Sequence, residues 1–196
     1  MASKKTLNAQ NLEELGAARL SELLIEITRG DAEGKRRLRL ELAGAQGSNA
    51  LAAEIRKRLA TIARSRSFVE WDRIKKLIKD LDQQRSAIAT QVAKDNPVEA
   101  LDLLWRFMAL ANSVFERCDD GSERLVAVFH AAVDDLGDIA TASRADPETL
   151  ADQVQAVLSE NDYGQFDYLI RSMTPALGSK GLAHLKQSLI TLSQTP

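Results

Sequence analysis

The segment NPVEALDLLWRFMALANSVFE, residues 96–116, decides the fold because it predicts a helix that is apolar on two sides. Asn96 is a good N-cap, Pro97 suits the first helical position, and Glu99 lies three residues beyond the cap. One apolar face comprises Leu101, Leu104, Trp105, Met108, Ala111 and Phe115, and the other comprises Leu103, Phe107, Leu110 and Val114. Such a helix needs neighbours on both sides, so we expect it to be the central one.

Helical patterns also flank this segment. The predicted helices cover about residues 20–27, 31–43, 48–66, 68–93 and 165–176, another ends near residue 143, and two more open near residues 146 and 178. In the last of them, Leu182, Leu185, Leu189 and Leu192 are expected to face inward. The stretch RLRLEL alternates as a strand would, but Leu, Arg and Glu favour helix and it contains no β-branched residue. With 4 prolines and 10 glycines in 196 residues, the composition predicts an all-α protein.

An internal period links three of the helix starts. Ser48, Asn96 and Asp146 are separated by 48 and 50 residues, and the two later starts share the patterns NPVEAL and DPETL. Helix pairs that repeat every 40 to 47 residues or so are typical of HEAT-like α-solenoids. We therefore predict one domain over residues 1–196: an α-α superhelix, built as a HEAT-like array of antiparallel helix pairs with about eight or nine helices.

The distribution of charge and the lack of long apolar runs limit the class of protein. Residues 1–100 carry 19 Lys and Arg against 14 Asp and Glu, whereas the whole chain has a net charge of −2, so the N-terminal half is basic and the rest acidic. No apolar run approaches the roughly 18 residues of a membrane-spanning helix, and the N-terminus lacks the apolar middle of a secretory signal. We expect a cytoplasmic protein without a membrane partner.

Cys118 is the only cysteine, so no disulfide can form within the chain.

Three stretches carry a family resemblance: LSELLIEITRGDAEGKRRLRLELAG, then FVEWDRIKKLIKDL with NPVEALDLLWRFMALANSVFERCDD, and DYGQFDYLIRSMTPALGSKGLAHL. Together they resemble a family of uncharacterised bacterial all-helical proteins that carry a domain of unknown function. The resemblance implies a bacterial helical-repeat protein, with no catalytic residues to carry over. It also implies that longer members continue beyond the position of Pro196.

The segment RSRSFVEWDRIKK, residues 64–76, combines five positive charges with two aromatics and raises the question of a nucleic-acid site. Ser67 and Glu70 have the spacing of a capping box, which predicts a helix that begins near Phe68. Phe68 and Trp71 are then interpreted first as packing groups of a capped helical corner. Contact with phosphates is the second interpretation.

The basic half supplies the main candidate contact residues. Arg37, Arg56, Arg58, Arg64, Arg66 and Arg73 are predicted to contact phosphates or a partner. Acidic residues are interleaved among them, which is more typical of a solvated surface. Tyr163 and Tyr168 are candidates for a partner groove; in the alternative interpretation, Asp162 caps the following helix and Phe166 packs.

No constellation typical of an enzyme is present in the sequence. It has no Gly-rich phosphate loop, no His-Glu-x-x-His and no cysteine pair. His130 and Asp134 lie four residues apart, but a solvated acidic helix face explains this spacing better than a metal site. We predict no catalytic, cofactor or metal site, and hence a protein that is not an enzyme.

The predicted function is therefore that of a non-enzymatic helical-repeat scaffold. It would bind another protein, or a second copy of itself, through a surface between successive helix pairs. The alternative is a nucleic-acid-binding protein that uses the basic N-terminal half through phosphate contacts.

Overall fold

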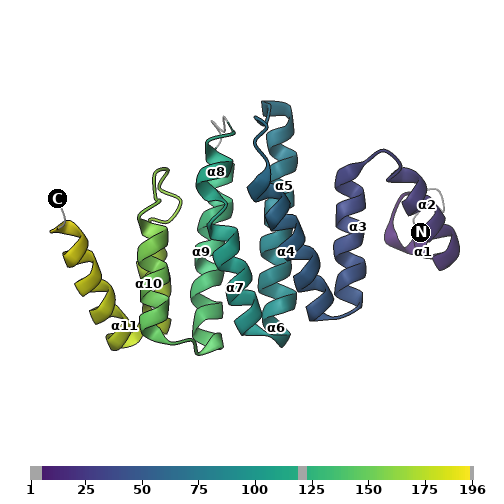
Figure 1. The fold of residues 1–196 in the computed structure, drawn as a ribbon. Coiled ribbons are helices and arrows are strands. Elements are labelled where there is room, and N and C mark those ends of the chain that lie inside the picture. The colour runs from purple at the N-terminus through teal and green to yellow at the C-terminus, as the bar shows by residue number, and fades with distance from the viewer. Residues whose placement is uncertain (1–5, 119–122, 195–196) are drawn as a thin grey trace. The chain divides into compact units, whose positions relative to one another are not determined.

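A computed structural model describes residues 6–118 and 123–194, and this part of the chain consists of helices joined by turns, without a β-strand (Figure 1). The all-α class is confirmed. The chain divides into two compact units, residues 1–41 and 42–196, and each is described by itself. The expectation of a single domain stays a prediction. Within the described ranges, no helix combines the length and the apolar character needed to cross a membrane.

The smaller unit is built from short helices with little buried surface. It contains α1 (Ala9–Glu13), α2 (Gly16–Ile27) and most of α3 (Ala32–Ala45), inside which the boundary between the units falls. The segment RLRLEL lies in α3, so its interpretation as helix is confirmed. The side chain of Asp31 accepts a hydrogen bond from the Glu33 amide, 3.0 Å away, at the start of α3.

The larger unit holds the core. Its elements are α4 (Ser48–Arg64), α5 (Trp71–Ala87), η1 (Ile88–Val92), α6 (Ala93–Asp95), α7 (Pro97–Met108), α8 (Ala111–Phe115), α9 (Arg124–Ser143), α10 (Pro147–Leu158) and α11 (Leu169–Ser193). Two predicted caps are confirmed: Asn96 accepts from the Glu99 amide at 3.1 Å, and Asp146 accepts from the Thr149 amide at 2.9 Å. The Thr149 bonds hold the pKa of Asp146 below its usual value.

The predicted central helix is central in unit 2. On α7, both apolar faces are buried, and the helix packs against α9, α4 and η1. The structure corrects its length, because the helix breaks at Ala109 and Leu110 before α8 begins. The Leu110 amide donates to the Phe107 carbonyl at 3.0 Å, a tighter turn that ends α7.

The predicted helix over residues 68–93 is wrong at its start, whereas the helical run ends at Asp95, close to the predicted end. It begins three residues later, at Trp71, because the Val69 amide pairs with the Arg117 carbonyl instead of entering a helix. Toward the other end, Ile88–Val92 adopts the wider π-helical turn, with Ile88 and Val92 fully buried. The apolar stripe itself is confirmed at Ile74 and Leu81.

The two C-terminal helices are separated near residue 178 as predicted, but the first of them begins later than predicted. Residues 161–168 form turns, and α11 then runs from Leu169 to Ser193 with a kink at Gly178, whose φ of 54° and ψ of −165° are not helical. The kink divides α11 into two arms, residues 169–177 and 179–193. Leu185 is buried as expected, but Leu189 and Leu192 are exposed because the second arm has no described neighbour over that part of its surface.

Helices α9 and α11 approach each other closely at Gly137. A Cβ atom at Gly137 would lie 2.3 Å from the Ser172 carbonyl oxygen, so only glycine fits there. We expect Gly137→Ala to force the helices apart and to lower the free energy of unfolding by about 1–3 kcal/mol. Urea denaturation measures this difference.

Gly44→Ala is the matched control. Its Cβ would meet only the mobile end of the Gln91 side chain, and alanine favours helix over glycine. We expect this variant to be at least as stable as the wild type. Equal destabilisation by the two substitutions would contradict the interpretation of Gly137.

Candidate functional site

The corner between α4 and α5 is the candidate site. Ser65 takes an extended conformation that ends α4, and the Val69 amide donates to the Arg117 carbonyl at 2.8 Å. Val69 and Cys118 form an isolated parallel β-bridge. The corner is thus attached by its backbone to the segment that follows α8.

The guanidinium of Arg117 fixes the same corner from the side. Its Nε donates to the Ser113 carbonyl at 2.8 Å, and its Nη1 donates to the Ser65 hydroxyl at 3.1 Å and to the Ser67 carbonyl at 3.2 Å. Bonds of a charged donor to carbonyl oxygens are stronger than neutral ones. One side chain therefore joins the end of α8 to both ends of the stretch of residues 65–67.

The two aromatics of the corner point into solvent. Phe68 is 58% exposed and Trp71 is 75% exposed, so their interpretation as packing groups is wrong. The capping box is wrong as well, since Glu70 is the N-cap of α5 and no side chain caps it. The only ring partner of Trp71 among the described residues is Lys75, whose Nζ lies 5.9 Å from the ring centroid. That contact leaves most of the indole uncovered.

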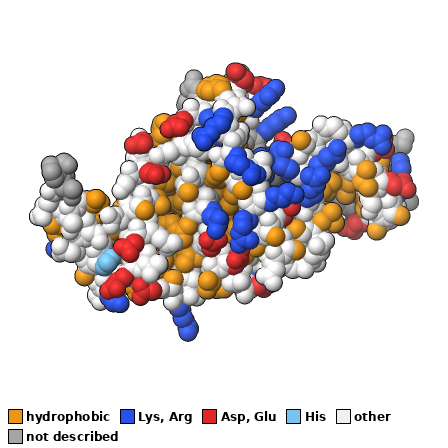
Figure 2. All heavy atoms as spheres, in the orientation of Figure 1, with side chains coloured by type: hydrophobic (Ala, Val, Ile, Leu, Met, Phe, Trp, Pro, Cys, Tyr) orange, Lys and Arg blue, Asp and Glu red, His pale blue; other side chains and the backbone are white. Residues whose placement is uncertain are grey.

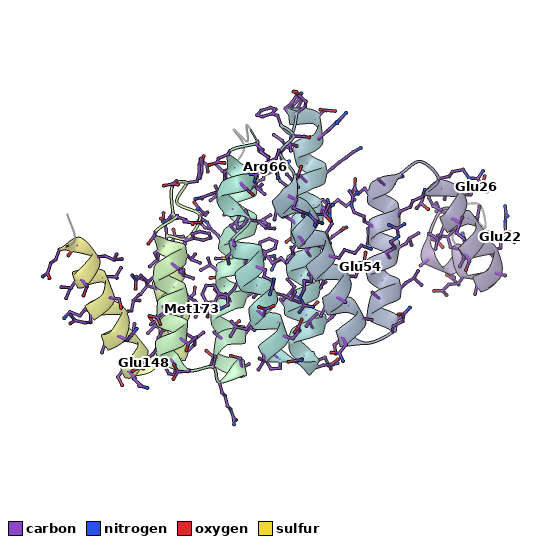
Figure 3. The ribbon with its side chains drawn as sticks, in the orientation of Figure 1. Glu22, Glu26, Glu54, Arg66, Glu148 and Met173 are labelled. Atoms are coloured by element: carbon purple, nitrogen blue, oxygen red, sulfur yellow. The ribbon has the colours of Figure 1, made fainter. Side chains whose placement is uncertain are left out.

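Three predicted contact residues surround these rings. Arg64, Arg66 and Arg73 are exposed, and their guanidinium groups make no ion pair or hydrogen bond with the residues that the structure describes. Lys and Arg side chains gather over α4 and α5 in Figure 2, and Figure 3 places Arg66 at the turn between these helices. We call Arg64, Arg66, Phe68, Trp71 and Arg73 the aromatic–basic corner.

Two other predicted arginines are engaged inside unit 2. Arg56 forms an ion pair with Glu99, which joins α4 to α7, and its Nη2 lies 3.9 Å from a carboxylate oxygen of Asp102. Arg58 joins α4 to α5 by donating to Asp80, with 2.9 Å between Nε and Oδ2. Their charges are partly neutralised within the fold, so they are weaker candidates for contacts with a partner.

A shallow groove lies beside Arg56, between α4 and α7. It encloses about 220 Å³ and is lined mainly by small or aliphatic residues, with Arg56 and Arg106 at its edge. Arg106 donates to Asp102 over 2.7 Å, and this bond raises the pKa of the guanidinium. Both cations of the groove thus share Asp102, and neither offers a free charge to a ligand.

The last predicted arginine belongs to the other unit. Arg37 is exposed on α3, within residues 1–41. The six arginines predicted as contact residues therefore fall into three groups. Three lie at the aromatic–basic corner, two are engaged in ion pairs within unit 2, and Arg37 lies in unit 1.

The two candidate tyrosines pack against other aromatics. Tyr163 stacks on Phe115 with ring centroids 4.7 Å apart, and Tyr168 meets the edge of His130 at 5.3 Å. Each tyrosine keeps about half of its surface exposed. Phe166 is buried, as the alternative interpretation expected. The expected cap at Asp162 is wrong because α11 begins only at Leu169.

The His130 and Asp134 side chains turn to different partners. His130 Nε2 lies 3.0 Å from the Gly164 carbonyl oxygen, and Asp134 accepts from the Ser172 hydroxyl at 3.2 Å. Both contacts tie α9 to the segment that contains Gly164 and to α11. Among the described residues, no three His, Cys, Asp or Glu side chains are grouped to hold a metal ion.

A first prediction concerns the ion pair between Arg58 and Asp80. Asp80 is buried, so Arg58→Met would leave a buried carboxylate without its guanidinium partner. We expect a loss of about 3–5 kcal/mol in the free energy of unfolding, measured by urea denaturation. Arg106→Met breaks an exposed pair and should cost about 1 kcal/mol or less. Equal losses would show that Asp80 does not depend on Arg58.

A second prediction concerns the hydrogen bonds by which Arg117 holds the corner. Arg117→Met removes every side-chain hydrogen bond to residues 65–67 and keeps much of the apolar volume. We expect amide hydrogens of the corner, Val69 above all, to exchange at least about tenfold faster, since each lost bond is worth about 1–3 kcal/mol. Hydrogen exchange followed by mass spectrometry measures this. Arg106→Met is the control and should leave the exchange of these amides unchanged. If Arg117→Met also leaves it unchanged, Arg117 does not anchor the corner.

Comparison with known proteins gives a family but no function. A family model described as "Family of unknown function (DUF6880)" matches residues 2–196. No curated protein and no solved structure matches the chain.

Proposed function

The chain belongs to the DUF6880 family, whose function is unknown, and we propose from the geometry that it is a non-enzymatic binding protein. In this proposal the aromatic–basic corner binds a segment of a partner protein that combines acidic and apolar side chains. The observation that carries the proposal is the exposure of Phe68 and Trp71 on a turn that the fold holds rigid.

Rigid exposed aromatics are costly unless a partner covers them. Water around the indole and phenyl rings is released on binding, and the turn needs little further ordering because Arg117 already fixes it. Trp and Arg are also the side chains most enriched among the residues that dominate binding energy at protein interfaces. The corner therefore has the composition and the preorganisation of an interface centre.

The charges of the corner indicate the chemistry of the partner. The three arginines can each bind a carboxylate through two parallel hydrogen bonds. Glu70 and Asp72 are exposed on either side of Trp71 in the sequence and would repel a continuous phosphate backbone. A peptide with separate acidic residues around an apolar anchor suits this mixed surface better than a nucleic acid does.

A single-stranded nucleic acid is the second candidate. One specific observation favours it: exposed aromatic rings beside arginines are the usual platform for stacked bases. Binding of this kind would weaken steeply as the salt concentration rises.

The arrangement of the helices supports a binding role in general terms. We propose that the helix pairs of unit 2 form a HEAT-like repeat, since α4, α7 and α10 open at the periodic starts Ser48, Pro97 and Pro147. Repeat folds of this kind present surfaces and turns to partners and need no catalytic site. A cytoplasmic location, and the bacterial origin that the family resemblance implies, belong to the same proposal.

The test compares three forms of the tagged chain in lysate of the source organism. We expect the wild type to retain a protein partner after nuclease treatment, and Phe68→Ser with Trp71→Ser to reduce recovery at least about tenfold, as loss of central interface residues does. Val98→Ser is the matched control, because Val98 is 64% exposed on α7, which begins at the other end of the unit 2 helices (Figure 1). It should behave as the wild type.

Other outcomes separate the candidates. Recovery that disappears with nuclease, together with binding of a labelled single-stranded RNA that depends on Phe68 and Trp71, would replace the protein partner by a nucleic acid. A partner retained equally by the double variant would remove the corner from the proposal. Thermal unfolding by circular dichroism verifies that all three forms are folded.

A further inference from the structure

Unit 1 contains an amphipathic helix, α2, whose apolar face is only partly covered within its own unit: α1 contacts it, and Leu20 and Leu23 are half-buried. None of the residues of α2 is buried, and Leu24, Ile25 and Ile27 are 47%, 66% and 73% exposed. Leu20, Leu23, Leu24 and Ile27 follow the spacing of one helix face. An isolated helix of 12 residues is marginal in water, so α2 gains from a partner that covers this face.

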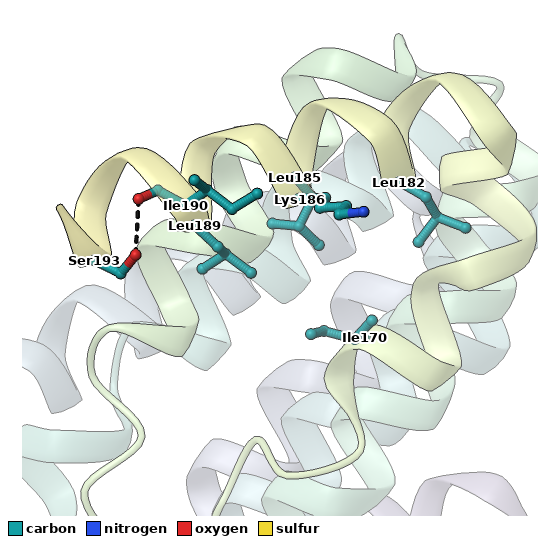
Figure 4. A pocket seen from close by; sticks show the side chains of 7 residues that line it. All are labelled: Ile170, Leu182, Leu185, Lys186, Leu189, Ile190 and Ser193. Atoms are coloured by element: carbon teal, nitrogen blue, oxygen red, sulfur yellow. Dashed lines mark hydrogen bonds between the residues drawn. The ribbon is translucent and has the colours of Figure 1, made fainter.

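Unit 2 contains an apolar groove of matching kind. The groove lies between the two arms of α11, encloses about 420 Å³ and is shown in Figure 4. Its lining consists of Ile170, Leu182, Leu185, Lys186, Leu189, Ile190 and Ser193. The bend at Gly178 creates the groove, because it turns the second arm away from the line of the first.

The charges beside the helix and the groove have opposite signs. Lys186 lines the groove and makes no ion pair with a described residue, and Glu26 on α2 makes none either. Glu22, on the same helix, pairs only with Arg19 in an exposed contact. An amphipathic helix that enters an apolar groove is a common mode of recognition, and opposite charges at the rim favour the correct partner.

We propose that α2 of one copy of this chain docks into the α11 groove of a second copy. The contact is heterologous, since it joins two different surfaces, and a dimer keeps one free groove on the chain that supplies the helix and one free helix on the chain that supplies the groove. Further copies can therefore add head to tail. The occupant is a second copy because the chain itself carries, in α2, exposed apolar side chains beside the carboxylate of Glu26, which match the apolar lining and the cation of the groove.

Symmetric contacts are disfavoured by the same residues. Two α2 helices placed face to face would bring together carboxylates of Glu22 and Glu26, and two α11 grooves would bring together the cations of Lys186. Two grooves also leave each other unfilled. The helix of one copy and the groove of the other complement each other in both shape and charge.

A complementation experiment tests the proposal with the full chain. One variant combines Leu24→Gln with Ile27→Gln and loses the helix face; the other combines Leu189→Gln with Ile190→Gln and loses the groove. In sedimentation velocity over a concentration series, we expect the wild type to self-associate and each variant alone to weaken association at least about tenfold, equivalent to 1.4 kcal/mol. Mixing the two variants should restore a complex of two chains, and no larger species.

Two further variants serve as controls. Val98→Gln removes an exposed aliphatic side chain that lies on neither of the two surfaces, so this variant should associate as the wild type does. Lys186→Glu adds a carboxylate at the groove, where it would face those of α2, and should weaken association without removing apolar surface. Because Lys186 is exposed, this variant is expected to fold even if the groove variant does not.

Several results would overturn the proposal. A wild-type chain that stays monomeric at every concentration would do so, and so would a mixture of the two variants that forms no complex. Association that survives loss of the groove would point to a symmetric α2 contact. Since Phe68 and Trp71 lie on neither surface, Phe68→Ser with Trp71→Ser should leave self-association unchanged, which separates this test from that of the proposed function.

Discussion

The two apolar faces of α7 are the constraint on which unit 2 depends. A helix with Leu103, Leu104 and Phe107 all fully buried needs more than one neighbour, and α7 packs against α9, α4 and η1 while keeping a narrow polar edge in solvent. The ion pair of Arg56 with Glu99 then joins α4 to α7 at the edge of this packing. Arg56, which was predicted from the sequence to contact a partner, is thereby engaged in holding helices of the core together.

The same packing decides which residues stay available for binding. Helix α8 follows α7 directly, so its end lies beside the turn after α4, and Arg117 can reach Ser65 and Ser67 from there. The turn is held by the hydrogen bonds of Arg117 and of the Val69 amide. Its aromatic side chains are therefore not needed for stability and remain in solvent. The proposal that this surface contacts a partner rests on that exposure, because stability alone would favour polar residues there.

Local patterns were sufficient for most of the fold and insufficient for the site. Asn96 and Asp146 act through amides three residues away, and the burial of α7 follows from its own periodicity, so both could be predicted from the sequence. The outward position of Trp71 could not, because it depends on the hydrogen bond between Val69 and Arg117, which are 48 residues apart in the sequence. Exposure of Leu189 likewise could not, because it depends on the direction in which the second arm leaves the bend at Gly178, and the sequence predicts only that a new helix opens there.

Self-association would change what the corner can do. One corner offers a small surface, with two aromatic rings and three guanidinium groups, and such a surface alone supports only modest affinity. If copies join through α2 and α11, several identical corners are carried by one assembly, and a partner with repeated acidic segments could engage more than one of them. Each later contact then forms at a high effective concentration, which can raise the overall affinity by about 10²-fold or more without any new type of contact. If both proposals hold, the contact between α2 and the α11 groove would set how many corners act together, and the corner would set what they bind.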